Sequence, residues 1–171
     1  RFLKHLTRNR ILLHIVDMAP FDGTEPADSA VAIAGELGRF SATLAERERW
    51  LVLNKTDLID AETFAERKTA VLAALDWQGP VYEVSAIKGE GTDALCGDLM
   101  NYLEELREQE KADPELAHAD VELQQRMQEE ARERIAELRS QHKRRADQEA
   151  EDDDDADWDD DEYDVDVEYV P

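Results

Sequence analysis

The sequence predicts an α/β fold in which a parallel β-sheet carries helices on its faces. Three short apolar runs occupy residues 11–17, 50–53 and 81–84. Continuous apolar runs of this length are typical of strands that are buried on both faces. Each run is followed by a segment with apolar residues at helical spacing. Alternation of strands and helices with short connections therefore predicts parallel pairing of the strands.

The first half of the chain contains three segments of predicted helix. Residues 1–8 have apolar side chains at helical spacing and are interpreted as the end of a helix. Residues 41–47 are predicted to form a short helix after a longer one over residues 27–40. The apolar positions that indicate the longer helix are Val31, Ile33, Ala34 and Leu37.

Two further helices are predicted in the second half of the folded part. Asp60 is the expected N-cap of a helix that runs to about residue 75, because Asp accepts hydrogen bonds from the free N–H groups of a first turn. Gly79 and Pro80 break the chain before the third strand. Thr92 is the expected cap of a helix through residue 106. On that helix Cys96, the only cysteine, is expected in the core.

The net charge of −23 comes mainly from the end of the chain. Residues 147–171 contain 15 Asp or Glu and no Lys or Arg, a composition that favours disorder. We therefore predict a folded domain over residues 1–110, a charged, solvent-exposed helical extension over residues 111–149, and a disordered acidic tail over residues 150–171. The folded part is only mildly acidic, which argues against nucleic-acid binding through a general basic surface.

Composition also limits the compartment and the chemistry. No apolar run approaches the roughly 20 residues that a membrane-spanning helix needs. A single cysteine excludes an internal disulfide and fits a reducing compartment. We expect a cytoplasmic monomer without membrane association. His5 and His14 lack partners at ligand spacing, so no metal site is predicted, and no catalytic residue is assigned.

The segment Asn54-Lys55-Thr56-Asp57 stands directly after the second predicted strand. In open α/β sheets, ligands bind outside the carboxyl ends of the strands. Guanine presents two adjacent donors, N1–H and the 2-amino group, and a carboxylate can accept both. We assign that contact to Asp57. Asn54 can contact the base and link neighbouring loops, the stem of Lys55 can lie along the base or ribose, and Thr56 supports the loop.

A second short segment, Ser85-Ala86-Ile87, follows the next predicted strand. The backbone N–H of Ala86 can donate to the guanine carbonyl, Ser85 can hydrogen-bond within its loop, and Ile87 can cover the far edge of the base. Asn and Asp at a strand end are also common turn residues. Two such loops on successive strands favour base recognition over a simple turn. Asp17, at the end of the first strand, is interpreted as a loop cap.

The phosphate-loop motif is absent from the sequence. It contains no GxxxxGK[ST] loop, so the main phosphate cradle and the Mg²⁺ ligand are missing from these 171 residues. Since the chain begins at Arg1 rather than Met, we expect a piece of a longer protein. On its own this piece is not expected to hydrolyse GTP.

The same residues resemble the Obg family of bacterial GTPases. The resemblance rests on RFLKHLTR at residues 1–8, LLHIVD at residues 12–17, the NKxD motif at Asn54–Asp57 and SAI at residues 85–87. The acidic stretch 157–162 is similar to tails of some members. The resemblance implies the C-terminal half of a P-loop GTPase domain, with GTP or GDP and Mg²⁺ as ligands. It also implies GTP hydrolysis in the full-length protein, association with the large ribosomal subunit and a role in its assembly. Residues 111–149 match the family poorly.

Two other interpretations remain open from the sequence. An Era- or Der-like GTPase would share the NKxD motif but would be expected to carry an RNA-binding domain or a second GTPase domain. A non-catalytic interaction protein could use the acidic tail as a mimic of nucleic acid.

Overall fold

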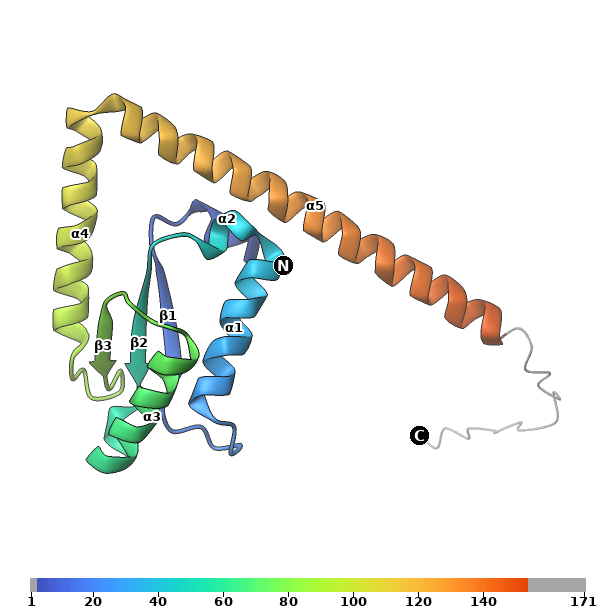
Figure 1. Ribbon diagram of the computed structural model, residues 1–171. Helices are drawn as coiled ribbons and strands as arrows, with labels where there is room; N and C mark the ends of the chain where they lie inside the picture. The colour runs from blue at the N-terminus through green and yellow to red at the C-terminus, as the bar shows by residue number, and fades with distance from the viewer. Residues whose placement is uncertain (1–2, 154–171) are drawn as a thin grey trace, which may run out of the picture. The chain divides into compact units, whose positions relative to one another are not determined.

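Three parallel strands form the centre of the computed structural model, which describes residues 3–153 (Figure 1). They are β1 (Leu12–Asp17), β2 (Arg49–Asn54) and β3 (Val81–Val84), in the order β1-β2-β3. Both pairings are parallel. The predicted α/β fold with a parallel sheet is therefore confirmed, with strand ends within two residues of the predicted ones.

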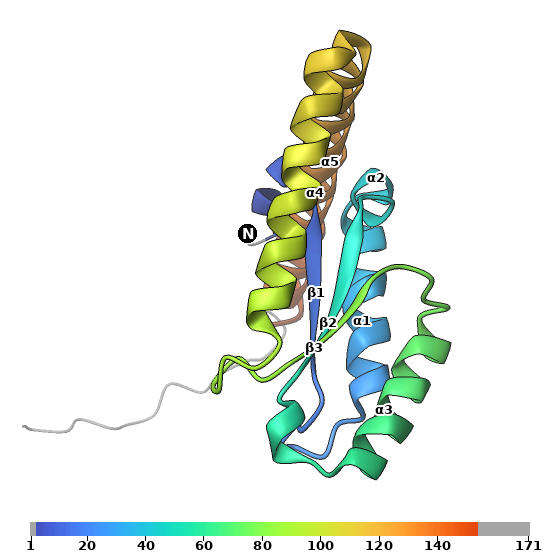
Figure 2. The same ribbon diagram turned by 90° about the vertical axis from the view of Figure 1, so that its left-hand side faces the viewer.

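Helices cover the two faces of the sheet (Figure 2). The helices α1 (Pro26–Phe40) and α3 (Ala61–Ala74) lie on one face, and α4 (Thr92–Ala112) lies on the other. The remaining helices of the described chain are α2 (Ala42–Ala45), α5 (Pro114–Asp153) and two 3-10 helices, η1 (Leu3–Arg8) and η2 (Thr56–Leu58). The N-terminal segment is thus helical as predicted, but as a 3-10 helix.

Each face of β2 packs into its own hydrophobic cluster. On the face of α1 and α3, Leu51 and Leu53 are fully buried together with Val71 of α3. On the face of α4, Trp50 and Val52 pack with a second set of apolar residues, Val84, Leu95, Leu99 and Tyr102. Burial on both faces is typical of a central parallel strand, and it explains the unbroken apolar run of β2.

The prediction that β1 is buried on both faces is wrong. Leu12, His14 and Val16 are buried, whereas Leu13 and Ile15 are exposed. Since β1 pairs only with β2 within residues 3–153, it is an edge strand there. A similar difference occurs on α1, which buries Ala30, Leu37 and Phe40 while Val31 and Ile33 remain exposed.

Two helix starts test the capping predictions. Asp60 caps α3 as predicted, because its Oδ1 accepts from the N–H of Thr63 at 2.9 Å. The prediction that Thr92 caps α4 is wrong, since Gly91 occupies the cap position and Thr92 is the first helical residue. Cys96 is exposed rather than in the core. Leu95 and Leu99 face the sheet, and Cys96 is rotated about 100° from Leu95 around the helix.

The charged extension is helical as predicted, but it is only partly solvent-exposed. Helix α5 starts at Pro114, and its Met127 and Ala131 are buried. The chain separates into two compact units, the first through Arg134 and the second from Ile135. The predicted disordered tail lies outside the described residues, apart from residues 150–153, which continue α5. Among the helices described, none is long and apolar enough to cross a membrane.

Polar contacts fasten the first half of α5 to the sheet domain. Glu130 accepts from the Ser41 hydroxyl at 2.6 Å, from the Thr43 N–H at 3.1 Å and from the Thr43 hydroxyl at 2.6 Å. Asp120 pairs with Arg47 at 2.7 Å and with Arg10 at 3.0 Å. Glu130 thus supplies a carboxylate at the start of α2, where a helix favours negative charge.

We expect Glu130→Gln to lower the free energy of unfolding at pH 7 by about 1–2 kcal/mol, because a charged acceptor of three hydrogen bonds is replaced by an amide. Burial raises the pKa of Glu130, but the hydrogen bonds from Ser41 and Thr43 outweigh this effect, so the pKa lies below its ordinary value. This stabilisation is present above the unfolded pKa and is lost as pH falls through the folded pKa.

Urea unfolding followed by Trp fluorescence at pH 7 and below pH 4.5 tests this expectation. The exposed neighbour Glu129 offers the matched control, and Glu129→Gln should leave unfolding unchanged. Equal midpoints for the two variants at pH 7 would contradict a stabilising role for Glu130.

Candidate functional site: the loops at the carboxyl ends of the strands

The three strands end side by side at one edge of the sheet. In the strand register, Asp17 of β1 lies opposite Asn54 of β2, and Asn54 lies opposite Val84 of β3. The parallel pairing therefore brings the loop after Asp17, the segment 54–57 and the segment 85–87 to the same edge. This is the edge at which open α/β sheets bind ligands.

Asn54 connects two of these loops. Its side-chain Oδ1 accepts from the backbone N–H of Ala86 at 3.1 Å, and its carbonyl accepts from the N–H of Met18 at 3.0 Å. The predicted link between loops is therefore present. The same contact occupies the Ala86 N–H that the sequence assigned to a guanine carbonyl. In this arrangement, a ligand has to share that N–H with Asn54 or take it over.

Asp57 lies in η2 with one carboxylate oxygen unused. Its Oδ1 is buried and has no hydrogen-bond partner in the described part of the chain. The Ser85 hydroxyl hydrogen-bonds the carboxylate and is the main cause that lowers the pKa of Asp57, with the positive charge of Lys88 adding to it. Asp57 is therefore an ionised acceptor at neutral pH.

Ser85 is itself held in a fixed orientation. It is fully buried, and its Oγ accepts from the N–H of Lys88 at 3.3 Å, which directs the hydroxyl proton towards Asp57. The Ser85 N–H donates to the carbonyl of Glu90 at 2.9 Å and closes the loop. These contacts are consistent with the prediction that Ser85 hydrogen-bonds within its own loop. They also link Ser85 to Asp57 in the segment 54–57.

Gly91 permits this closed loop. Its φ of +74° lies in the left-handed region, and a Cβ there would stand 2.2 Å from the carbonyl oxygen of Glu83. Only glycine avoids both costs at once. Within the loop, Ile87 is 88% exposed and points an apolar side chain into solvent beside the strand ends. Such exposure leaves Ile87 available to cover a ligand.

Lys55 has an unusual backbone and a specific partner. Its φ is 69°, in the left-handed region that non-glycine residues rarely adopt. Its Nζ lies 2.5 Å from Oδ2 of Asp17 and 4.9 Å from the centroid of the Phe21 ring. Thr56, the next residue, begins η2 and is half-buried.

Asp17 has two contacts, of which the sequence predicted one. Its Oδ1 accepts from the N–H of Ala19 at 2.9 Å, so the predicted loop cap is confirmed. The ion pair with Lys55 was not predicted. The signal that could have found it is the strand order, because the end of β1 adjoins the end of β2 in a parallel sheet.

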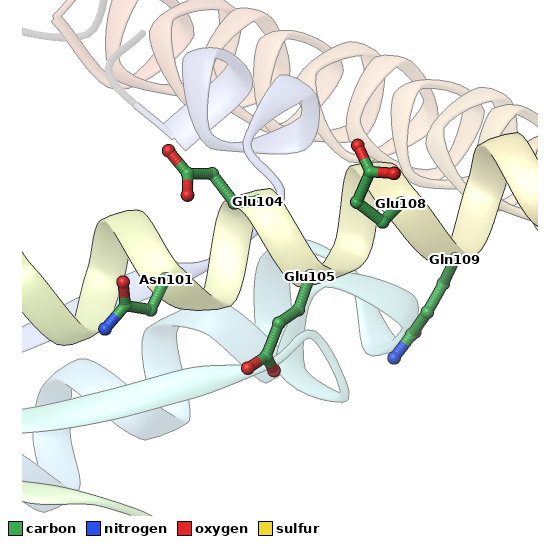
Figure 3. A pocket seen from close by; sticks show the side chains of 5 residues that line it. All are labelled: Asn101, Glu104, Glu105, Glu108 and Gln109. Carbon is green, nitrogen blue, oxygen red and sulfur yellow. The ribbon is translucent and has the colours of Figure 1, made fainter.

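A surface hollow elsewhere on the described chain does not involve these loops. It lies along the second half of α4 and is lined by Asn101, Glu104, Glu105, Glu108 and Gln109. Figure 3 shows that Glu104 and Glu108 project from one side of the helix and Glu105 from another. The hollow contains none of the residues predicted to bind the base.

No protein-family model matches the chain. Among residues 3–153, no cluster of three or more His, Cys, Asp or Glu side chains is arranged to hold a metal ion. The candidate site therefore rests on the geometry of its own residues.

Proposed function

We propose that the segments 54–57 and 85–87 recognise the guanine base of GTP or GDP. The observation that supports this most directly is the buried, unpartnered Oδ1 of Asp57. Buried polar atoms in native proteins nearly always have a partner, so an ionised oxygen without one indicates a donor from a ligand. The guanine N1–H and 2-amino groups are two donors at the spacing of one carboxylate.

The neighbouring side chains fit the same ligand. Ser85 orients the Asp57 carboxylate, the amide of Asn54 can contact the base edge, and the Lys55 stem and Ile87 provide apolar contact. This arrangement holds and selects a base. It contains no group that we assign to attack or protonate a phosphate.

We further propose that the chain is the C-terminal half of the P-loop GTPase domain of a longer, Obg-like protein. That protein would hydrolyse GTP with Mg²⁺ in the cytoplasm and act in assembly of the large ribosomal subunit. Support comes from the motifs at residues 1–17, 54–57 and 85–87 together with their common edge of the sheet. We assign the Mg²⁺ ligands and the phosphate loop to segments outside these residues.

Titration of the ¹⁵N-labelled chain with GMP, IMP and AMP, followed by NMR shifts of residues 54–57 and 85–87, tests base recognition. IMP lacks the 2-amino group, and AMP lacks both donors. We expect affinity to fall in the order GMP, IMP, AMP, by roughly tenfold for each lost donor that leaves a buried acceptor unpaired. Equal shifts with all three nucleotides, or shifts outside both segments, would contradict the proposal.

A further inference from the structure

We infer that Asp17 is a positioning residue of the base site, which holds Lys55 so that the Lys55 stem forms one wall of the base pocket. The inference rests on the proposed function and adds to it a residue outside both recognition segments. Asp17 is the last residue of β1, whereas Lys55 follows β2, and the sequence analysis assigned Asp17 only to its own loop.

The first support is the geometry of the pair. The Lys55 ammonium lies 2.5 Å from one carboxylate oxygen of Asp17, while the other oxygen of Asp17 accepts from the Ala19 N–H at 2.9 Å. Asp17 is thereby fixed by its own backbone loop. Lys55 is in turn fixed at its far end, so its methylene stem spans the space between the β1 and β2 ends rather than moving freely in solvent.

The second support is the backbone of Lys55. A left-handed lysine is strained, and such strain persists where surrounding contacts enforce it. Asn54 on one side is held through Ala86, and Asp17 holds the lysine side chain. The left-handed residue turns the chain from β2 into η2, which carries Asp57. Lys55 therefore connects the position of the base-reading carboxylate with that of Asp17.

The third support is the exposed ring beside the pair. Phe21 is 92% exposed, and its ring lies 4.9 Å from the Lys55 ammonium. A cation over an aromatic face is attracted by the ring quadrupole. The ammonium thus has contacts to Asp17 and Phe21, and the stem is the part of Lys55 that can meet a flat ligand. A wall of this kind contacts the ring face and does not distinguish one purine edge from another.

The pair is partly exposed, with 32% of the Lys55 side chain and 41% of the Asp17 side chain accessible. Ion pairs of this exposure have modest strength. We therefore expect its loss to raise the Kd for GMP about two- to fivefold. Because the contact is to the ring face, the Kd for IMP should rise by the same factor.

Three variants separate positioning from a structural role. Asp17→Asn keeps an oxygen for the Ala19 N–H and removes only the charge that pairs with Lys55. Asp17→Ala removes both contacts. Lys55→Met keeps a stem of similar length and removes the ammonium. In the NMR titration with GMP and IMP, Asp17→Asn and Lys55→Met should weaken binding to the same extent. The double variant should bind no more weakly than either, because both changes remove one interaction.

The outcomes distinguish a failure of the positioning role of Asp17 from a failure of the proposed base recognition. Suppose that the unmodified chain prefers GMP, that the Asp17→Asn variant binds GMP with the same Kd as the unmodified chain, and that Asp17→Ala binds GMP more weakly. Asp17 is then only a loop cap, and the inference is overturned. Multiplicative effects in the double variant would also overturn it. If the unmodified chain shows no preference for GMP over AMP, the proposed base recognition itself fails, and the inference fails with it.

Discussion

Asp57→Asn is expected to shift base preference from guanine towards xanthine. Xanthine carries a carbonyl where guanine carries the 2-amino group, and the Asn amide supplies a donor for that carbonyl. In the unmodified chain the same carbonyl would oppose a carboxylate oxygen. We expect the ratio of the Kd values for GMP and XMP to change by about 100-fold, as two buried contacts change from matched to mismatched. Paired NMR titrations of the chain with GMP and XMP measure this ratio.

Asp60→Asn provides the matched control for this experiment. Asp60 lies three residues further along and caps α3 with the same carboxylate chemistry, and Asn is an equally good cap. This variant should keep the preference for GMP. A GMP preference that survives in Asp57→Asn would show that another residue reads the base edge.

His14 is expected to make stability depend strongly on pH. Its ring is 4% exposed, and neither ring nitrogen has a hydrogen-bond partner among residues 3–153. Burial, with a smaller contribution from the charge of Arg49, lowers the pKa of His14 from 6.5 to about 4. The unfolded chain therefore takes up a proton first as pH falls below 6.5. Stability is lost between pH 6.5 and pH 4, by up to about 3 kcal/mol in total.

His14→Leu tests this dependence by comparison of urea unfolding from pH 7 to pH 4. The variant should be at least as stable as the unmodified chain at pH 7, because it removes two buried nitrogens without partners. It should also lose the part of the pH dependence that belongs to the imidazole. His5 is exposed, so His5→Leu should retain the full dependence. Parallel pH profiles for His14→Leu and the unmodified chain would assign the dependence to other groups.

The order of strands and helices could be predicted from the sequence because it depends on local periodicity and on short apolar runs. The sequence could not predict which face of each apolar strand is covered by other residues. Ile15 and Leu53 belong to equally apolar strands, yet Ile15 is 55% exposed and Leu53 is fully buried. The difference arises from the position of each strand in the sheet, which is a property of the tertiary arrangement. Cys96 was misplaced for the same kind of reason, since helical spacing alone does not select the face.

The segments 54–57 and 85–87 lie at one edge of the sheet as predicted, because strand ends meet in a parallel sheet. Their pairwise contacts were less predictable. Asn54 and Ala86 are 32 residues apart in sequence, and Asp17 and Lys55 are 38 apart. Only the strand register brings them together. The sparse apolar residues of α5 likewise gave little sign that Met127 and Ala131 would be buried.

The attachment of α5 decides where this chain can be shortened. A stop codon after Ala112 would end the chain at the break between α4 and α5. This position is close to the boundary at residue 110 that composition alone indicates. The truncation would remove Asp120 and Glu130, and so leave Arg47 and the first residues of α2 without their carboxylate partners. A stop codon after Arg134 would retain all these contacts. The shortest stable fragment of the chain therefore needs the first half of α5 in addition to the strands and helices around the proposed base site.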